Sequence, residues 1–92
     1  MHNMVYLMGR MSNNFKEVNK DVYTFKIAVQ RDYADEHGIY EVDFITCSVK
    51  KNLLTEYTEL ARKGDLIGVR GSLQEGKVHA NKFTVLSTKK VV

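Results

Sequence analysis

The chain has 92 residues, of which 43% are hydrophobic and 27% are charged. This composition excludes disorder as the default state, and the length fits one small domain that buries only about 60–65% of its unfolded surface. The net charge of +3 permits a polyanionic partner but does not require one. No apolar run approaches the roughly 20 residues of a membrane span, and the N-terminus lacks a secretory-signal pattern. The sequence therefore predicts a single cytoplasmic domain over residues 1–92 with no membrane partner.

The first expected strand covers residues 4–10, and a polar stretch then leads to Asp21. Gly9 within this strand predicts a bulge or a sharp bend. Met4, Tyr6 and Met8 occupy alternate positions and so share one side of the strand. An interface or core position is favoured for them over a contact with nucleic acid.

Two longer strands are expected over residues 22–31 and 42–50, and each has one apolar and one polar side. The apolar side predicts the core, and the polar side predicts a solvated face with hydroxyls, lysines and a single phenylalanine. Cys47 is the only cysteine, so no internal disulfide can form, and its thiol is expected to act as a small hydrophobic group. The apolar positions are Phe25, Ile27, Val29, Ile45, Cys47 and Val49, and the polar side holds Thr24, Lys26, Gln30, Phe44, Thr46, Ser48 and Lys50.

A long loop rich in carboxylates joins these two strands. Arg31 is the only cation beside the acidic groups of this segment. A phosphate chain along them would meet repulsion of about 1 kcal/mol per close pair in water. We therefore expect the loop tip to turn away from nucleic acid or to contact a protein. The acidic residues are Asp32, Asp35, Glu36, Glu41 and Asp43.

The second half of the chain predicts a helix and two more strands. Apolar residues at helical spacing predict a helix over residues 52–63, which Gly64 ends. Strands over residues 66–73 and 78–87 follow, joined by a tight turn at residues 75–76. Three strands, a helix and two strands are the elements of the OB-fold, a five-stranded Greek-key barrel that binds ligands on its second and third strands. We expect this all-β fold, with one short α-helix between strands 3 and 4; a small barrel without a helix is the main rival.

Four blocks of the sequence resemble, in order, the bacterial and phage single-stranded DNA-binding protein family. The resemblance covers nearly the whole chain. It implies a dimer or tetramer that coats exposed DNA during replication, recombination or transfer, with replication or recombination proteins as possible partners. The compact size and the shortened loop are more similar to a phage or mobile-element member, or to a primosomal relative, than to a housekeeping member. Family members commonly end in an acidic tail, whereas this chain ends in Lys-Lys-Val-Val at residues 89–92. The four blocks are Asn3–Arg10, Tyr23–Arg31, Val42–Val49 and Leu60–Leu73.

The resemblance implies four base-stacking positions, of which this chain keeps two. Phe44 matches an aromatic early in the family's third strand, and Tyr33 matches one just after the second strand. Lys50 stands where a third aromatic is expected, and the loop that carries the fourth is here reduced to residues 75–77. Lys63 matches the family's lysine before the glycine at the helix end. A shorter footprint or weaker binding than in the large family members is implied.

Single-stranded nucleic acid needs flat surfaces for its bases and cations for its phosphates, and the polar face offers both. Other roles stay open for the two aromatics. Phe44 could pack under the loop or inside a subunit interface, and Tyr33 could anchor the loop. The residues expected to contact nucleic acid are Phe44, Tyr33, Lys50, Lys26, Arg10, Thr46, Ser48, Lys63, Arg70 and Lys77.

Catalysis and metal binding find little support in the sequence. The histidines His2, His37 and His79 have no cysteine or carboxylate at a metal-ligand spacing. No hydroxyl or thiol has an evident histidine–acid pair, so neither an enzyme nor a cofactor is expected. Two alternatives to DNA binding remain. One is an OB-fold protein-interaction module with weak or no nucleic-acid binding, favoured by the acidic loop and the missing aromatics; the other is an RNA-binding OB domain.

Overall fold

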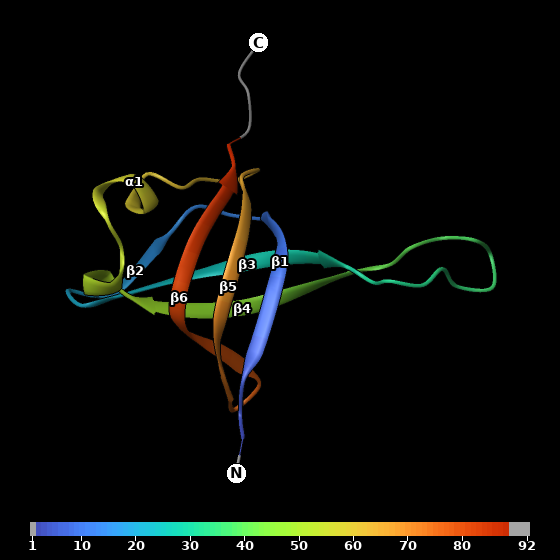
Figure 1. The fold of residues 1–92 in the computed structure, drawn as a ribbon, viewed down its shortest axis with the longest axis horizontal. Helices are drawn as coiled ribbons and strands as arrows, with labels where there is room; N and C mark the ends of the chain where they lie inside the picture. The colour runs from blue at the N-terminus through green and yellow to red at the C-terminus, as the bar shows by residue number, and fades with distance from the viewer. Residues whose placement is uncertain (1, 89–92) are drawn as a thin grey trace.

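The computed structural model describes residues 2–88, which form a closed β-barrel with a long hairpin projecting from one side (Figure 1). Around the barrel the strand order is β1-β5-β6-β4-β3, and pairing of β1 with β3 closes it. The predicted five-stranded barrel is confirmed, and the expectations for residues 89–92 lie outside the described residues. The strands are β1 (Val5–Met11), β2 (Lys16–Asn19), β3 (Val22–Gln30), β4 (Val42–Lys50), β5 (Leu66–Gln74) and β6 (Lys77–Ser87), and the helical segments are η1 (Lys51–Leu53) and α1 (Glu56–Glu59).

The barrel interior is filled by the apolar side of each strand. Phe25 and Ile27 of β3 are buried, as are Cys47 and Val49 of β4, and the predicted core side of both strands is thereby confirmed. Burial raises the pKa of the Cys47 thiol to about 12, so this side chain stays protonated and neutral in the core. The remaining buried apolar residues are Met11, Ala61, Ile67, Val69, Val78 and Phe83.

Gly9 allows the strand crossing that closes the barrel. β1 pairs with β5 in continuous register from Val5 to Arg10, and its end, Arg10 and Met11, also pairs with β3. A Cβ atom at Gly9 would lie 2.1 Å from the carbonyl oxygen of Ala28 on β3. The expected bulge is therefore absent from this register, and the glycine serves a close approach of two backbones instead.

The prediction of one helix over residues 52–63 is wrong in its extent. The structure has one turn of 3-10 helix, η1, and the four-residue helix α1, separated by Leu54 and Thr55 in extended conformation. Thr55 starts α1 as a capping box with Thr58, whose amide donates to Thr55 Oγ1. Leu60 is 76% exposed, so the apolar pattern has no continuous face to bury. No helix among residues 2–88 is long and apolar enough to cross a membrane.

A short strand, β2, lies in the polar stretch where no strand was expected. It pairs with the edge of β3, and all four of its residues are exposed. Because neither side of β2 packs on the core, its sequence lacks the alternation that would reveal a strand. The turn expected at residues 75–76 is confirmed: Glu75 and Gly76 both have positive φ, as a tight two-residue hairpin requires.

Candidate nucleic-acid interface

The outward side of β3 and β4 forms a polar face in the predicted register, which we call the outer face. Residues opposite each other on the two antiparallel strands point to the same side, so the register sets which side chains are neighbours. Thr46 pairs with Lys26, and Ser48 pairs with Thr24. Lys50 lies at the end of β4. These positions keep the hydroxyls and lysines of the two strands together, as the sequence predicted.

Phe44 is the exposed aromatic of the outer face. Its side chain is 65% exposed, although it lies within a nine-residue strand. Opposite it is Ala28, and opposite Ala28 on the next strand is Arg10. The row Arg10–Ala28–Phe44 thus places a cation near an open aromatic ring with only a methyl group between them. A base stacked on Phe44 would have a guanidinium available for its phosphate.

A loop of two asparagines brings three cations to one side of this row. Asn13 Oδ1 accepts a hydrogen bond from the backbone amide of Lys26 at 2.8 Å. Asn14 Oδ1 accepts one from the amide of Lys63 at 2.7 Å. Arg10 Nη1 donates to the carbonyl oxygen of Gly64, the residue after Lys63, at 3.3 Å. The residues Arg10, Lys26 and Lys63 therefore cluster around residues 12–15, and all three are exposed.

Lys50 and Lys77 lie at the other end of the outer face, where β6 runs beside β4. The parallel pairing of these strands places His79 opposite Ser48, and Ser48 Oγ and His79 Nδ1 are 3.1 Å apart. From the sequence, His79 was weighed only as a metal ligand. Its place between the inward-facing Val78 and Ala80 indicates that it points outward, but its contact with Ser48 could not be predicted without the pairing of β4 with β6.

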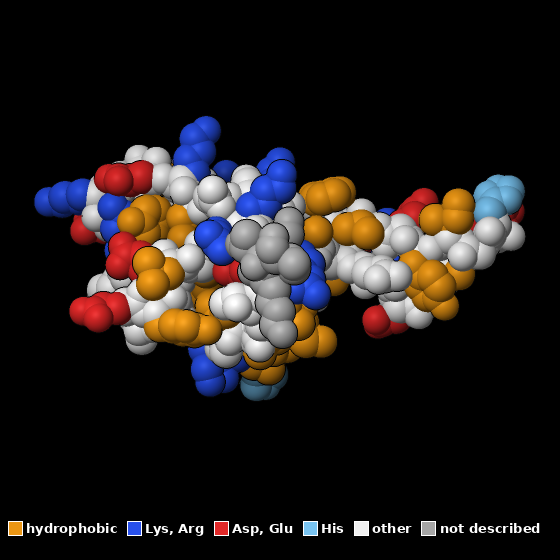
Figure 2. Space-filling view, turned by 90° about the horizontal axis from the view of Figure 1, so that it is seen from above, with side chains coloured by type: hydrophobic (Ala, Val, Ile, Leu, Met, Phe, Trp, Pro, Cys, Tyr) orange, Lys and Arg blue, Asp and Glu red, His pale blue; other side chains and the backbone are white. Residues whose placement is uncertain are grey.

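The segment over residues 31–41, which we call the arm, projects away from the barrel (Figure 1). Tyr33 lies at the start of the arm and is 66% exposed. Several apolar side chains lie along the arm, where they are seen beside the carboxylates in Figure 2. Ile39 is 58% and Tyr40 51% exposed, so both add to the open apolar surface near Tyr33. The sequence did not single out Ile39.

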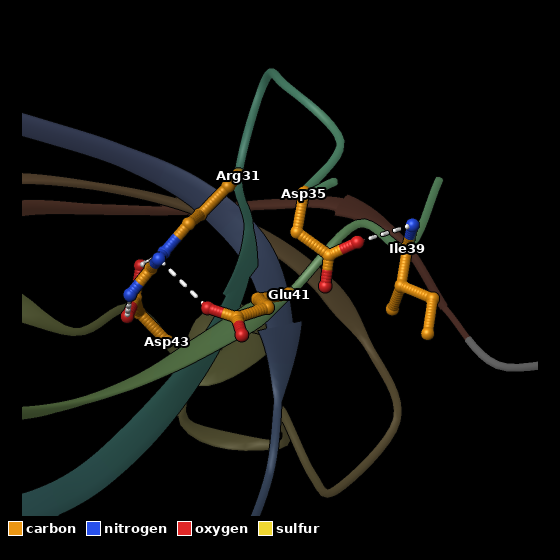
Figure 3. A network of polar contacts seen from close by, with 5 residues as sticks. All are labelled: Arg31, Asp35, Ile39, Glu41 and Asp43. Atoms are coloured by element: carbon orange, nitrogen blue, oxygen red, sulfur yellow. Dashed lines mark hydrogen bonds and ion pairs between the residues drawn. The ribbon is translucent and has the colours of Figure 1, made fainter. Parts of the chain in front are cut away.

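Arg31 forms ion pairs with two carboxylates at the base of the arm and offsets one of their two negative charges (Figure 3). Its guanidinium donates to both oxygens of Asp43, at 3.0 and 3.1 Å, and its Nη1 lies 2.7 Å from Glu41 Oε2. The hydrogen bonds from Arg31 hold the pKa of the Asp43 carboxyl below its usual value. The charge opposing a phosphate chain near Phe44 is therefore reduced.

Two further carboxylates of the arm, Asp35 and Glu36, lie towards its tip. Asp35 Oδ1 accepts hydrogen bonds from the amides of His37 and Ile39, at 2.8 and 2.9 Å, and so shapes the turn. Glu36 lies 3.4 Å from His37 Nε2. The tip projects from the barrel, so these charges lie away from the row that contains Phe44 (Figure 1).

Arg70 lies on a different side of the barrel from Phe44. On β5 it is opposite Tyr6 of β1 and Lys82 of β6, and its Nε donates to Asn81 Oδ1 at 3.2 Å. The remaining predicted contact residues lie on the outer face, on its two ends or on the arm. The structure thus gathers all of the candidates except Arg70.

Comparison with known proteins matches the sequence of this chain to a family. Residues 2–92 match the model of the single-strand binding protein family. Single-stranded DNA-binding protein 1 of Streptococcus agalactiae is 35% identical over 78 residues, which cover 80% of this chain and 48% of that protein. The single-stranded DNA-binding protein of Enterococcus faecalis is 35% identical over 78 residues, which cover 80% of this chain and 42% of that protein. The chain spans about half the length of the relatives that it matches.

Solved structures share the fold. The small single-stranded DNA-binding protein from Streptomyces coelicolor superposes with a TM-score of 0.67 at 20% identity, covering 92% of this chain and 94% of that one. The dimeric N-terminal domain of PriB protein from Thermoanaerobacter tencongensis gives a TM-score of 0.68 at 16% identity, covering 91% of this chain and 96% of that one. These likenesses confirm the predicted OB-fold.

Proposed function

The chain belongs to the single-strand binding protein family, and we propose that it binds single-stranded DNA of any sequence without catalysing a reaction. Bases stack on Phe44, and on Tyr33 where the strand leaves the barrel. The cations around the outer face neutralise the phosphates. Every base has a flat face, so such a site accepts many sequences, and it excludes duplex DNA because duplex bases are already stacked on each other.

The observation that carries this proposal is the exposure of Phe44. A phenylalanine that is 65% exposed on a strand side otherwise made of Thr46, Ser48 and Lys50 contributes little to the barrel's own packing. It does offer a flat apolar surface in the same row as Arg10 and close to Lys26. An unpaired base covers such a surface while its phosphates remain near Arg10 and Lys26.

The proposed path crosses the outer face between its two basic ends. One end is the cluster around residues 12–15, and the other is formed by Lys50 and Lys77. Thr46 and Ser48 lie between them and offer hydroxyl groups to the strand. Arg70 lies on β5 beside this path and touches its edge only through Asn81 of β6, so its own contact with DNA remains a prediction from the sequence.

The biological setting follows from the same function. We propose that residues 1–92 act as a single domain that self-associates and coats exposed DNA in the cytoplasm during replication, recombination or transfer. Replication or recombination proteins are its proposed protein partners. The name of the Streptococcus agalactiae relative supports the DNA part of this proposal. A protein-interaction module without nucleic-acid binding is not favoured, because it leaves the exposed ring and its surrounding cations without a role.

A titration with an oligo-dT of about 30 nucleotides tests the proposal. The full chain is expected to bind the labelled strand at micromolar concentration or below in low salt. A duplex of the same length is expected to compete poorly, and a matched RNA strand measures the preference between the two nucleic acids. Lack of binding to oligo-dT at micromolar protein would reject the proposal and restore the protein-interaction alternative.

A further inference from the structure

A groove of about 640 Å³ opens at the Lys50 end of the outer face, between β2, β3, η1 and β6. Its size falls within the range of about 300–1,000 Å³ typical of small-ligand sites. Val18, Val22 and Leu53 give it apolar walls. Val18 is 61% and Leu53 45% exposed, so these walls present open apolar surface that a flat ligand would cover.

One side of the groove carries hydrogen-bonding groups from β4 and β6. Ser48, His79 and Asn81 all line it. Ser48 lies 3.1 Å from His79 Nδ1, which leaves the second ring nitrogen, Nε2, for another partner. Asn81 Oδ1 accepts from Arg70 Nε, which leaves the amide NH₂ of Asn81 as a donor for a ligand. Donors and acceptors beside apolar walls suit a ligand with a flat body and a polar edge.

The charge of the groove favours an anionic ligand. Lys50 and Lys77 line it, and no carboxylate does so among the described residues. Glu17 on the neighbouring β2 is 3.3 Å from Lys51 Nζ and is thus already paired. Two unopposed ammonium groups beside apolar walls and polar edges match a nucleotide, which combines a flat base with a phosphate.

We propose that this groove holds one nucleotide of the bound strand and reads the edge of its base. The inference rests on the proposed function, because the groove begins at Ser48 and Lys50 on the same face as Phe44. Phe44 and Ser48 are four positions apart along β4, a rise of about 13 Å, so the two sites hold different nucleotides. Lys50 stands where the family resemblance implies a stacking aromatic. The nucleotide that would stack there is instead held against the walls of the groove. Hydrogen bonds to the base edge give the protein a preference among bases that stacking alone would not.

Nuclear magnetic resonance spectra of the ¹⁵N-labelled full chain test which part of a nucleotide the groove binds. The probes are the four deoxynucleoside monophosphates, thymidine and inorganic phosphate. Nucleotides and thymidine are expected to shift the amides of Val18, Ser48, Leu53 and His79. Phosphate alone is expected to shift only the amides near Lys50 and Lys77. If no nucleotide shifts the wall residues Val18 and Leu53, the proposal is rejected.

His79→Ala tests the reading of the base, with His37→Ala at the arm tip as the matched control. The wild-type chain is expected to prefer one of oligo-dT, oligo-dC and oligo-dA of equal length. His79→Ala should weaken binding to the preferred strand about two- to tenfold, as expected for one lost hydrogen bond, and bring the three affinities closer together. His37→Ala should leave their ratios unchanged.

The outcomes separate this inference from the function on which it rests. A wild-type chain that binds none of the three strands rejects the proposed function. A chain that binds all three with the same ratios before and after His79→Ala retains the function and loses the groove as a base-reading site.

Discussion

Phe44 is the residue on which DNA binding is expected to depend most. Phe44→Ala should weaken binding to oligo-dT about ten- to hundredfold, since a stacked base contributes about 1–3 kcal/mol. The free energy of unfolding should change by about 0.5 kcal/mol or less, because the ring is mostly outside the core. A strand titration and a thermal melt of the same variant measure both effects.

Tyr57→Ala is the control for Phe44→Ala, because Tyr57 is 61% exposed but lies on α1. It should leave DNA affinity unchanged. A large loss of stability with unchanged affinity in Phe44→Ala would show that Phe44 packs inside the protein or its assembly and that the outer face is wrongly assigned.

The ion pairs of Arg31 make stability depend on pH in the acid range. The folded pKa of Asp43 is lowered, chiefly by the hydrogen bonds from Arg31, whereas an unfolded aspartate titrates near about 3.9. The stabilisation is therefore complete above the unfolded pKa and is lost as pH falls through the lowered, folded value. Chemical unfolding between pH 6 and about 2 should show a steeper acid loss for wild type than for Asp43→Asn.

Asp32→Asn is the matched control, since Asp32 lies in the same arm but the ion pairs of Arg31 are with Glu41 and Asp43. Its acid profile should follow that of wild type. Parallel profiles for wild type and Asp43→Asn would mean that the contact with Arg31 does not contribute to stability in solution.

Side-chain direction at these residues could be predicted from alternation alone. Phe44 points outward because Ile45, Cys47 and Val49 take the core side of the same strand. The contact of Arg31 with Asp43 could not be predicted in this way, because it depends on how the arm brings its two ends together. The pairing of Ser48 with His79 needs the parallel register of β4 and β6, which no local pattern specifies.

At the scale of elements, the crossing of β1 over β3 leaves no space for a side chain at Gly9. Gly9→Ala would place a Cβ atom 2.1 Å from the Ala28 carbonyl oxygen, and two strands would have to separate to relieve the contact. We expect a destabilisation of about 1–3 kcal/mol, as for overpacking in a well-packed core. A denaturant titration measures it, and an unchanged midpoint would mean that the strands adjust without cost.

Elements whose apolar side meets the core were the ones that could be located from the sequence. β3, β4, β5 and β6 begin and end within a residue or two of their expected limits. β2 has no buried residue, and the residues before β5 bury only Ala61 and Asp65. Of the five residues that gave the helical spacing there, Leu53, Tyr57 and Leu60 are exposed. Only Leu54 and Ala61 pack on the core, which is too little packing to hold a helix of the predicted length.

At the scale of the whole molecule, binding should weaken steeply with salt. About four to six phosphate contacts predict a slope of log K against log salt of roughly −3 to −4. Lys26→Ala should reduce the magnitude of this slope by about 0.7, the value for one contact with a single strand. Lys82→Ala, on β6 opposite Arg70 and outside the proposed path, is the control and should not alter it. A nearly flat dependence in wild type would place the cations away from the DNA.

The outward side of β1 predicts self-association. Met4, Tyr6 and Met8 are 74%, 61% and 56% exposed in the isolated chain, and Leu86 of β6 lies on the same face. Light scattering at tens of micromolar should show a dimer or larger species. Met8→Lys should shift the mass towards the monomer, whereas Leu60→Lys, at an equally open site beside α1, should not. A monomeric wild type at this concentration contradicts the prediction.

The order of elements along the chain was sufficient to predict the barrel as a whole. The pairing that closes the barrel could not be located from this order, because the contact between β1 and β3 depends on Gly9 and on the far end of β1, which pairs with two strands at once. The proposed DNA-binding face followed from the barrel, whereas the groove beside it did not. The groove needs β2, η1 and β6 together, and two of these were wrongly assigned or missing from the sequence prediction.

The projecting arm has a consequence for how proteins of this architecture can diversify. The buried core of the described residues takes no side chain from residues 32–41, and β3 and β4 remain paired up to Gln30 and Val42. The length and the side chains of this hairpin can therefore change without altering the barrel that carries it. Changes in the arm beyond Tyr33 would leave Phe44 and the cations of the outer face in place, so contacts with protein partners can vary there while the proposed DNA-binding face stays the same.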